Sequence, residues 1–407
     1  AQLLDFSKQY FWKISALGEN KNILSFSDIG KFTTKSTYPV LGLKPDGGVE
    51  SFIPTLKWDK NAYFPVEVFK KSAELGLASI YVSEKDGGTG LTRLDASLIF
   101  EELAYACPST SAFLSIHNMT AWMLSEYGNN DLKNKYMKSI TSMENVCSYC
   151  LTEPGSGSDA IAMKTKGKPD KDNSSLNING SKSFISGAGV SDLYFVMMKT
   201  ETSEDNETSC VIVEKNYDGI SFGKNEEKMG WKNQPTRVVS FDECIVPYEN
   251  IVGRPGEGFK IAMQGLDGGR INIASCSLGA ARFCIDKCID YISERKQFGK
   301  FLKEFQSIQF KIADMITDYN AARLMVHEAA NALDLKQSDT TIKSAMAKKF
   351  ATDVCFNICN EALQIHGGYG YLSEYGIEKM VRDCRVHQIL EGTNDIMKLI
   401  ISRDSLK

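Results

Sequence analysis

The pattern of hydrophobic and polar positions divides the chain into a helical part, a β-rich part and a second helical part. From about Trp58 to Glu144, apolar residues recur every three or four positions. The segment FPVEVFKKSAELGL (residues 64–77) is an example, and its pattern ends at Gly76, a typical helix stop. Such spacing places apolar side chains on one helix face, so we expect this part to be all-α.

The pattern changes near Val146. The segments SLNINGSKSFIS, DLYFVMMKT, SCVIVEK and TRVVSFDECIV either alternate or run β-branched, and they are separated by turn sequences such as NG and DG. This predicts an antiparallel β domain that resembles a small barrel or sandwich. No strand–helix–strand alternation occurs here, so the GSG of this region is not expected to be a dinucleotide fingerprint.

Long helical patterns return after Gly256. Residues 306–333 place their apolar side chains on one stripe, and residues 340–365 continue in the same way up to Gly367-Gly368, a glycine helix stop. Several helices of this length imply an antiparallel bundle. The expected fold class is α+β, with an atypical segment over 1–56, an N-terminal all-α domain over 57–145, a central antiparallel β domain over 146–255 and a C-terminal four-helix-type bundle over 256–407.

Residues 1–56 differ from the rest of the chain. They lack sustained periodicity of either kind and are rich in Ser, Thr, Gly and Lys, so no compact structure is predicted for them. The chain begins with Ala1 rather than Met, and no targeting peptide is visible.

Composition excludes some classes of protein. A net charge of -4 and a pI near 5.8 argue against a nucleic-acid binder, which usually carries a basic excess. No uninterrupted apolar run approaches the roughly 20 residues that a membrane helix needs, so no membrane span is expected.

The chain has 11 cysteines and only four histidines. Two pairs lie one helical turn apart, which is typical of small apolar residues on a buried helix face: Cys284 with Cys288, and Cys355 with Cys359. A single C-x-x-C occurs at residues 147–150. Reduced, buried thiols are favoured over a metal or redox site, and no metal is expected.

The octet TEPGSGSD (residues 152–159) stands where the β domain begins. Its small residues allow the main chain to approach a flat cofactor, and Thr152, Ser156 and Ser158 offer hydroxyl donors. By these properties alone, a plain tight loop is an equal alternative.

Two other loci carry candidate chemistry. Glu391 stands where the apolar pair Ile389-Leu390 ends and a new helical pattern starts, which suits a general base whose substrate develops negative charge. Asp267-Gly-Gly-Arg270 is expected to open a long helix, so that Arg270 meets an anionic or polar part of a ligand. The alternative for Arg270 is an inward side chain with a structural partner.

These segments, together with SKSFISGAG, ERKQFGKFLKEFQ, QIHGGYGYL and VHQILEGTND, resemble the acyl-CoA dehydrogenase family over residues 58–407. The resemblance implies an FAD cofactor, part of which is held by a neighbouring subunit. It assigns FAD binding to Tyr149, Cys150, Leu151, Thr152, Glu153, Pro154, Gly155, Ser156, Gly157, Ser158, Phe184, Ile185, Ser186, Arg295, Phe305, Gln306, Gln364, Ile365, His366, Gly367, Gly368, Thr393, Asn394 and Asp395. It assigns substrate binding to Ser158, Asp267, Gly268, Gly269, Arg270 and Arg403.

The resemblance also implies the reaction. Glu391 would remove the α-proton of an acyl-CoA thioester while a hydride passes from the β-carbon to the flavin. Some relatives carry their base immediately before the matching arginine, but Gly269 occupies that place here. Leu390 is similar to the residue in the branched short-chain type, so isobutyryl-CoA is the expected substrate. The alternatives are 2-methylbutyryl-CoA or another short acyl-CoA, and a non-catalytic homologue.

Members of the family pass their electrons to electron-transferring flavoprotein, assemble as homotetramers and act in the mitochondrial matrix, and the resemblance implies the same here. The sequence departs from the family pattern over residues 1–56, where the expected first amphipathic helix is not found.

Overall fold

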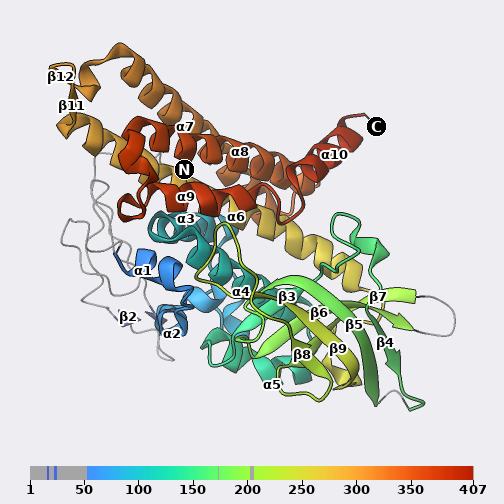
Figure 1. Ribbon diagram of the computed structural model, residues 1–407. Coiled ribbons are helices and arrows are strands. Elements are labelled where there is room, and N and C mark those ends of the chain that lie inside the picture. The colour runs from blue at the N-terminus through green and yellow to red at the C-terminus, as the bar shows by residue number, and fades with distance from the viewer. Residues whose placement is uncertain (1–15, 18–22, 25–52, 173, 202–205, 407) are drawn as a thin grey trace. The chain divides into compact units, whose positions relative to one another are not determined.

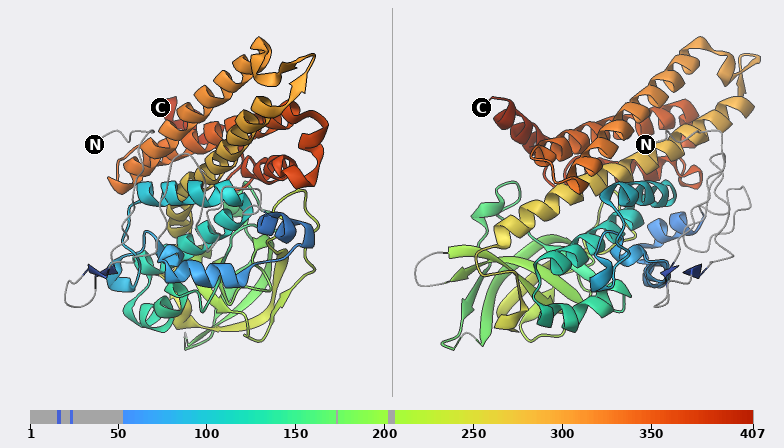
Figure 2. Two further views of the ribbon diagram at one scale, coloured as in Figure 1. Left: turned by 90° about the vertical axis from the view of Figure 1, so that its left-hand side faces the viewer. Right: turned by 180° about the vertical axis from the view of Figure 1, so that it is seen from behind.

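The computed structural model describes residues 16–17, 23–24, 53–172, 174–201 and 206–406 (Figures 1 and 2). The chain separates into two units, Ala1–Thr55 and Leu56–Lys407. In the first unit, strand β1 (Ala16–Leu17) pairs antiparallel with β2 (Ile23–Leu24). The other residues of the atypical N-terminal segment, up to residue 52, lie outside the described residues.

The second unit begins with helices, as the apolar spacing predicts. Local signals fix several of their ends: a reciprocal Thr92–Asp95 capping box starts α3, Pro108 occupies the first turn of α4, and the Asn129 side chain caps α5. Helix α2 ends before Gly76, whose φ of 77° is a left-handed conformation that glycine adopts without strain. The helices are α1 (Ile53–Asn61), α2 (Val66–Glu74), α3 (Arg93–Ala106), α4 (Pro108–Tyr127) and α5 (Asn130–Thr141).

The middle part is an eight-stranded sheet whose main path runs β10-β7-β6-β4-β5-β9-β8, with β3 paired to β6. Most neighbours are antiparallel, as expected, but β3 and β4 both run parallel to β6. The strands are β3 (Cys147–Cys150), β4 (Lys166–Pro169), β5 (Ser175–Ser186), β6 (Leu193–Glu201), β7 (Asn206–Glu214), β8 (Ile220–Phe222), β9 (Thr236–Pro247) and β10 (Ile251–Val252).

Strand β6 is buried on both faces, which explains its unbroken apolar sequence. Phe195 and Met197 pack into a core shared with α4 and α5, whereas Tyr194, Val196 and Met198 face a second core formed by β5, β7 and β9. Figure 1 shows α4 and α5 beside the sheet. The sheet is thereby anchored to the N-terminal helices through one strand.

The C-terminal part consists of long helices that run side by side (Figures 1 and 2). Small residues allow close packing: at Gly279, a Cβ would lie 2.2 Å from the carbonyl oxygen of Glu101 in α3. The elements are α6 (Gly258–Glu294), β11 (Lys296–Gln297), β12 (Lys300–Phe301), α7 (Gln306–Asp334), α8 (Thr340–His366), α9 (Ile377–His387) and α10 (Asn394–Ser405).

One expectation about this part is wrong. Asp267–Arg270 does not open a helix, because α6 begins at Gly258 and these residues lie in its third and fourth turns. Their backbone N–H groups therefore belong to the helix ladder and are not available to an anion. The 11 cysteines are all free and buried, as their spacing suggests. In the described part of the chain, no helix has the length and apolarity needed to span a membrane.

Candidate active site

Glu391 lies in the short connection between α9 and α10. Its backbone is left-handed, with a φ of 55°, and Gly392 follows with a φ of 85°. A non-glycine residue in this region is uncommon and mildly strained, so the surrounding structure must hold it. Thr393 then caps α10 by accepting a hydrogen bond from the Ile396 N–H at 3.3 Å. The chain thus reverses at Glu391 and places its side chain inward.

The Glu391 carboxyl group faces the middle of α6. At Gly269, a Cβ atom would lie only 2.4 Å from Glu391 Oε2 and 2.9 Å from its Cδ, so glycine alone leaves room for the carboxylate. Oε2 is buried and has no hydrogen-bond partner within the described residues. Burial raises the pKa of Glu391 to about 7, although the positive charges of Arg270 and Lys348 oppose the rise. A carboxylate with these properties is suited to accept a proton near neutral pH.

Arg270 is buried and holds the loop of Glu391. Its Nη1 pairs with Asp267 Oδ1 at 2.7 Å, and its Nε donates to the backbone carbonyl of Glu391 at 3.4 Å. The other Asp267 oxygen accepts a hydrogen bond from the Thr341 hydroxyl at 2.7 Å. The structure therefore favours the alternative reading, in which Arg270 points inward and has structural partners.

Gly268, the neighbour of Gly269, has a different contact. A Cβ there would lie 2.5 Å from Arg93 Nη1. The Arg93 guanidinium is buried and lies 3.5 Å from the centre of the Tyr81 ring. Two adjacent glycines thus admit two side chains from outside the helix, a carboxylate and a guanidinium.

The TEPGSGSD octet forms a turn at the start of the sheet. Glu153 and Ser156 exchange backbone hydrogen bonds, and Gly155 and Gly157 face open space, with no heavy atom within 4 Å of a Cβ built on either. The Glu153 carboxylate fixes the turn from below, because it accepts hydrogen bonds from the backbone N–H groups of Lys164 and Thr165 and from the buried ammonium of Lys182 at 2.8 Å. Hydrogen bonds therefore hold the Glu153 side of the turn, whereas the two glycines leave its other side open.

Phe184 projects from a bulge in β5. The pairing of β5 with β9 shifts register between Lys182 and Ile185, and Phe184 has a φ of 59° and a side chain that is 70% exposed. The Ser183 N–H donates to the Thr152 carbonyl at 2.8 Å, which ties this bulge to the octet. An exposed aromatic ring beside an open glycine turn fits the flat ring of FAD.

Tyr149 adds a polar group to this region. Its hydroxyl is buried and has no partner among the described residues, and its pKa is raised by burial and by the nearby Glu391 charge. Buried polar atoms are normally hydrogen-bonded. The Tyr149 hydroxyl and Glu391 Oε2 are two neighbouring buried groups without a partner in the described residues, which fits a site that is completed by a bound molecule. By contrast, Cys150 and Ile185 point into the core, and only their backbones are available to a ligand.

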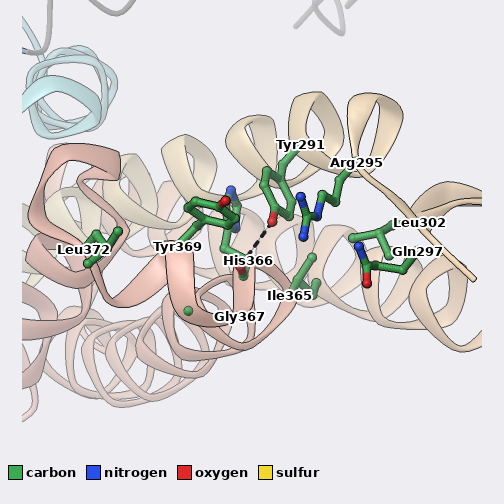
Figure 3. Close-up of a pocket in the computed structure, with 10 residues that line it drawn as sticks. Tyr291, Arg295, Gln297, Leu302, Ile365, His366, Gly367, Tyr369 and Leu372 are labelled. Atoms are coloured by element: carbon green, nitrogen blue, oxygen red, sulfur yellow. Dashed lines mark hydrogen bonds between the residues drawn. The ribbon is translucent and has the colours of Figure 1, made fainter.

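A second candidate region lies at the far end of α6 (Figure 3). It is a cavity of about 410 Å³ lined by Tyr291, Arg295, Gln297, Leu302, Ile365, His366, Gly367, Gly368, Tyr369 and Leu372. The Tyr291 hydroxyl donates to the His366 carbonyl at 3.3 Å, and the two rings stack. Gly367 and Gly368 leave open space where side chains would stand, and Arg295 contributes a positive charge. This donor set fits a phosphate-bearing molecule.

The two regions do not meet within one chain. Gly269 and Arg295 are separated by most of α6, which corresponds to about 39 Å at 1.5 Å per residue. Most of the residues that the family resemblance assigns to FAD therefore belong to two separate groups, one around the TEPGSGSD turn and Phe184 and the other at the cavity of Arg295. A single cofactor reaches both groups only if they come from different copies of the chain.

Some predicted residues lie in neither group. Asn394 is buried, and its side chain is engaged by protein atoms, including Asp353 Oδ1 at 2.7 Å. Asp395 pairs with Lys398 at 3.0 Å on the surface. Four others are half-buried or exposed and do not line the cavity: Phe305 directly before α7, Gln306 on α7, Gln364 on α8 and Arg403 on α10.

The structure also places residues at these sites that the motifs do not single out. Tyr291 stands four positions before Arg295, so the helical repeat alone puts both on one face. Lys348 lies within a buried stripe of α8 that also contains Ser344, Thr352 and Cys355. Because lysine is rarely buried, its place in this stripe could have identified it from the sequence as a candidate functional residue. In the described ranges, no group of His, Cys, Asp and Glu side chains is arranged to hold a metal ion.

Comparison with known proteins agrees with the resemblance. The N-terminal, middle and C-terminal domains of acyl-CoA dehydrogenase match residues 50–144, 148–244 and 256–406. Mitochondrial isobutyryl-CoA dehydrogenase of Dictyostelium discoideum is 51% identical over 352 residues, and that of Bos taurus is 50% identical over 351 residues. Both alignments cover 86% of this chain and 84% of the relative.

A solved structure gives the same result for the fold. Butyryl-CoA dehydrogenase from Megasphaera elsdenii superimposes with a TM-score of 0.82 at 32% identity, over 91% of this chain and 100% of that one. The expected α+β fold class is confirmed. The chain belongs to the acyl-CoA dehydrogenase family and is an FAD-dependent oxidoreductase.

Proposed function

We propose that the chain catalyses the α,β-dehydrogenation of isobutyryl-CoA to methacrylyl-CoA, with Glu391 as the base that removes the α-proton. The observation that carries this proposal is the Glu391 carboxyl group, which is buried against Gly269 with an unpartnered Oε2 and a pKa raised to about 7. The substrate follows from the two relatives, both named isobutyryl-CoA dehydrogenases, and from Leu390 before the base.

A thioester α-proton is too weakly acidic for an ordinary solvated carboxylate. Burial of Oε2 reduces the hydration of the Glu391 carboxylate and increases its basicity, and a bound substrate excludes the remaining water. The backbone N–H of Glu391 has no acceptor among the described residues and is available to the thioester carbonyl, where negative charge develops. When bound, FAD supplies the acceptor for the hydride that leaves the β-carbon.

The residues that would hold FAD come from two copies of the chain. We propose that the TEPGSGSD turn, Phe184 and Tyr149 of one protomer bind the flavin end, and that the cavity at Arg295 of a neighbour binds the phosphate-bearing end. The 39 Å or so between the two regions supports this division. Large exposed apolar side chains on the same outer segments, Phe298, Phe310 and Leu324, support burial in a homotetramer.

The remaining assignments rest on the family and on the relatives. Reduced flavin needs an electron acceptor, and we propose electron-transferring flavoprotein. Both relatives are named mitochondrial, which supports a place in the mitochondrial matrix and in valine catabolism. The alternative substrates are 2-methylbutyryl-CoA and other short acyl-CoAs, because one or two methylenes in an apolar pocket change binding by only about 1–3 kcal/mol.

Anaerobic addition of isobutyryl-CoA to the purified yellow protein is expected to bleach the oxidised-flavin absorbance promptly. The bleaching should be faster and more complete than with butyryl-CoA or isovaleryl-CoA, because the two relatives on which the substrate assignment rests are named isobutyryl-CoA dehydrogenases. Faster bleaching by 2-methylbutyryl-CoA would reassign the substrate. A yellow protein that no short acyl-CoA bleaches would contradict the proposed reaction, and a colourless one would indicate a non-catalytic homologue.

The pH dependence of kcat/KM is expected to show an acid limb near pH 7. The base acts only when Glu391 is ionised, and burial raises its pKa to about 7, so kcat/KM should fall about tenfold per pH unit below that value. Steady-state assays from pH 5.5 to 8.5 with a subsaturating substrate measure this limb. A limb near pH 4.5, the ordinary value for a solvated glutamate, would show that Glu391 is not the titrating base.

A further inference from the structure

Lys348 is a fully buried lysine beside the active-site loop. It lies in the middle of α8, and its side chain is 0% exposed. Its Nζ donates to the backbone carbonyl of Gly392 at 2.8 Å and to Asn394 Oδ1 at 2.8 Å. Within the described residues, no carboxylate lies within ion-pair distance of this ammonium. Buried lysines are rare and are normally paired with a carboxylate, so this position needs an explanation.

The acceptors of Lys348 belong to the turn that presents Glu391. Glu391 and Gly392 are consecutive left-handed residues, and their two carbonyl groups are each held by a different buried cation. Arg270 of α6 donates to the Glu391 carbonyl at 3.4 Å, and Lys348 of α8 donates to the Gly392 carbonyl. The strained turn is therefore held from two helices, and only the Lys348 bond is short.

The Asn394 side chain connects the same turn to α8 through hydrogen bonds. Its Nδ2 donates to Asp353 Oδ1 at 2.7 Å and to Thr352 Oγ1 at 3.0 Å, and its Oδ1 accepts from Lys348. The first residue of α10 is thus bound through its side chain to two successive turns of α8. Lys348 is the charged member of this network and the one that also contacts the backbone of the loop.

The charge of Lys348 acts on Glu391. Burial disfavours the ammonium and lowers the pKa of Lys348 to about 7, while the Glu391 charge opposes this effect. In return, the Lys348 charge opposes the rise in the Glu391 pKa. The other charged or titratable groups that face this pair are Arg270 of α6, Asp353 of α8, His387 of α9, whose pKa is lowered to about 3, and the phenols of Tyr81 and Tyr149.

We propose that Lys348 is a positioning residue for proton abstraction: it fixes the Glu391–Gly392 turn through the Gly392 carbonyl and Asn394, and it places an ammonium beside the base, where the positive charge favours the ionised carboxylate. This inference rests on the proposed role of Glu391 and adds a residue that does not touch the substrate. Because the ammonium is buried behind the loop, its removal should affect kcat and the acid limb rather than substrate binding.

The test uses Lys348→Met, Lys348→Gln and a matched control, Lys343→Met, in the flavin-loaded enzyme. Methionine keeps the volume but removes both donor and charge, whereas glutamine keeps an N–H donor. Lys343 also lies on α8, is partly exposed and pairs with Glu328 at 2.9 Å and Asp339 at 3.2 Å, so its variant removes the same charge without touching the network of Gly392 and Asn394. All variants are compared by flavin content, kcat, KM and the pH profile of kcat/KM.

Lys348→Met is expected to lower kcat about 10- to 100-fold, with KM changed less than about threefold, and to move the acid limb up by about one pH unit. Lys348→Gln should show the same upward shift of the limb and a smaller loss of kcat, because a donor remains. Lys343→Met should match the wild type in both kcat and the position of the acid limb.

A flavin-loaded Lys348→Met or Lys348→Gln with wild-type kcat and an unmoved acid limb would overturn the proposal. If neither neutral variant folds with flavin while Lys343→Met does, Lys348 is purely structural and the proposal is equally wrong. Wild-type enzyme and Glu391→Gln are measured in parallel. If the wild type is inactive, or Glu391→Gln is fully active, the proposed function itself has failed, and that outcome is distinct from a failure confined to Lys348.

Discussion

Glu391→Gln is expected to lower kcat by about 10²–10⁴-fold while the protein still folds and remains yellow. Glutamine has nearly the shape of glutamate but cannot accept the α-proton. Burial disfavours the charged carboxylate in the folded protein, and a neutral amide avoids this cost, so no loss of stability is expected from the charge itself. Anaerobic bleaching with isobutyryl-CoA and steady-state kcat measure the loss, and flavin absorbance and the thermal midpoint report on folding.

The control for this variant is Glu249→Gln, the same chemical change at an exposed glutamate of the middle domain. It should retain wild-type kcat and flavin content. Wild-type turnover by flavin-loaded Glu391→Gln would remove this residue from the mechanism and leave the family assignment intact.

Gly269→Ala is expected to lower kcat while the protein still folds and binds flavin. The new Cβ would lie 2.4 Å from Glu391 Oε2, far inside van der Waals contact, so the carboxylate must move. A shift of about 1 Å in a catalytic group costs about 10²-fold in rate, and we expect a loss of kcat of that order. Alanine in a helix interior is about 1 kcal/mol more favourable than glycine, so the variant should fold and bind flavin.

Gly265→Ala, one turn earlier in α6, is the matched control. Its Cβ would meet the terminal methyl of Met123, which is the flexible end of a side chain, and not Glu391. This variant should keep kcat within a few-fold of the wild type. Equal rates for Gly269→Ala and the wild type would mean that Glu391 acts from a position other than the one described.

The order of helical and β-rich parts was predictable because it rests on local periodicity. The apolar stripe of residues 306–333 and the glycine stop at Gly367 correspond to α7 and to the end of α8. The parallel pairing of β3 and β4 with β6 was not predictable, because strand partners are chosen by tertiary packing and leave no trace in an alternating pattern.

The start of α6 was misplaced for a physical reason. Asp267 followed by two glycines has the local composition of a helix start, since glycine is unfavourable inside a helix. Here the two glycines lie inside a helix. These positions require glycine because larger residues would collide with Arg93 and Glu391. The motif therefore identified residues that lie at this site, but its local composition indicated a helix start where the structure has a helix interior.

Lys348 shows a second limit. A lysine on the buried stripe of α8 can be recognised from its spacing, but its acceptors, Gly392 and Asn394, are more than forty positions away in the sequence. Only the fold brings them together. Contacts of this kind, between distant segments and through backbone carbonyls, carry no residue-type signature that a sequence motif could record.

The uninterrupted length of α6 has a consequence for how this protein tolerates change. One continuous helix carries Gly269, which admits the Glu391 carboxylate, and ends directly before Arg295, which lines the distal cavity. Inserting or deleting a single residue between them would rotate one site relative to the other by about 100° and shift it by about 1.5 Å. A substitution along this stretch alters the contacts of one residue, whereas a change of length alters the orientation of the two sites relative to each other. The spacing between these two positions is therefore a fixed dimension of the molecule.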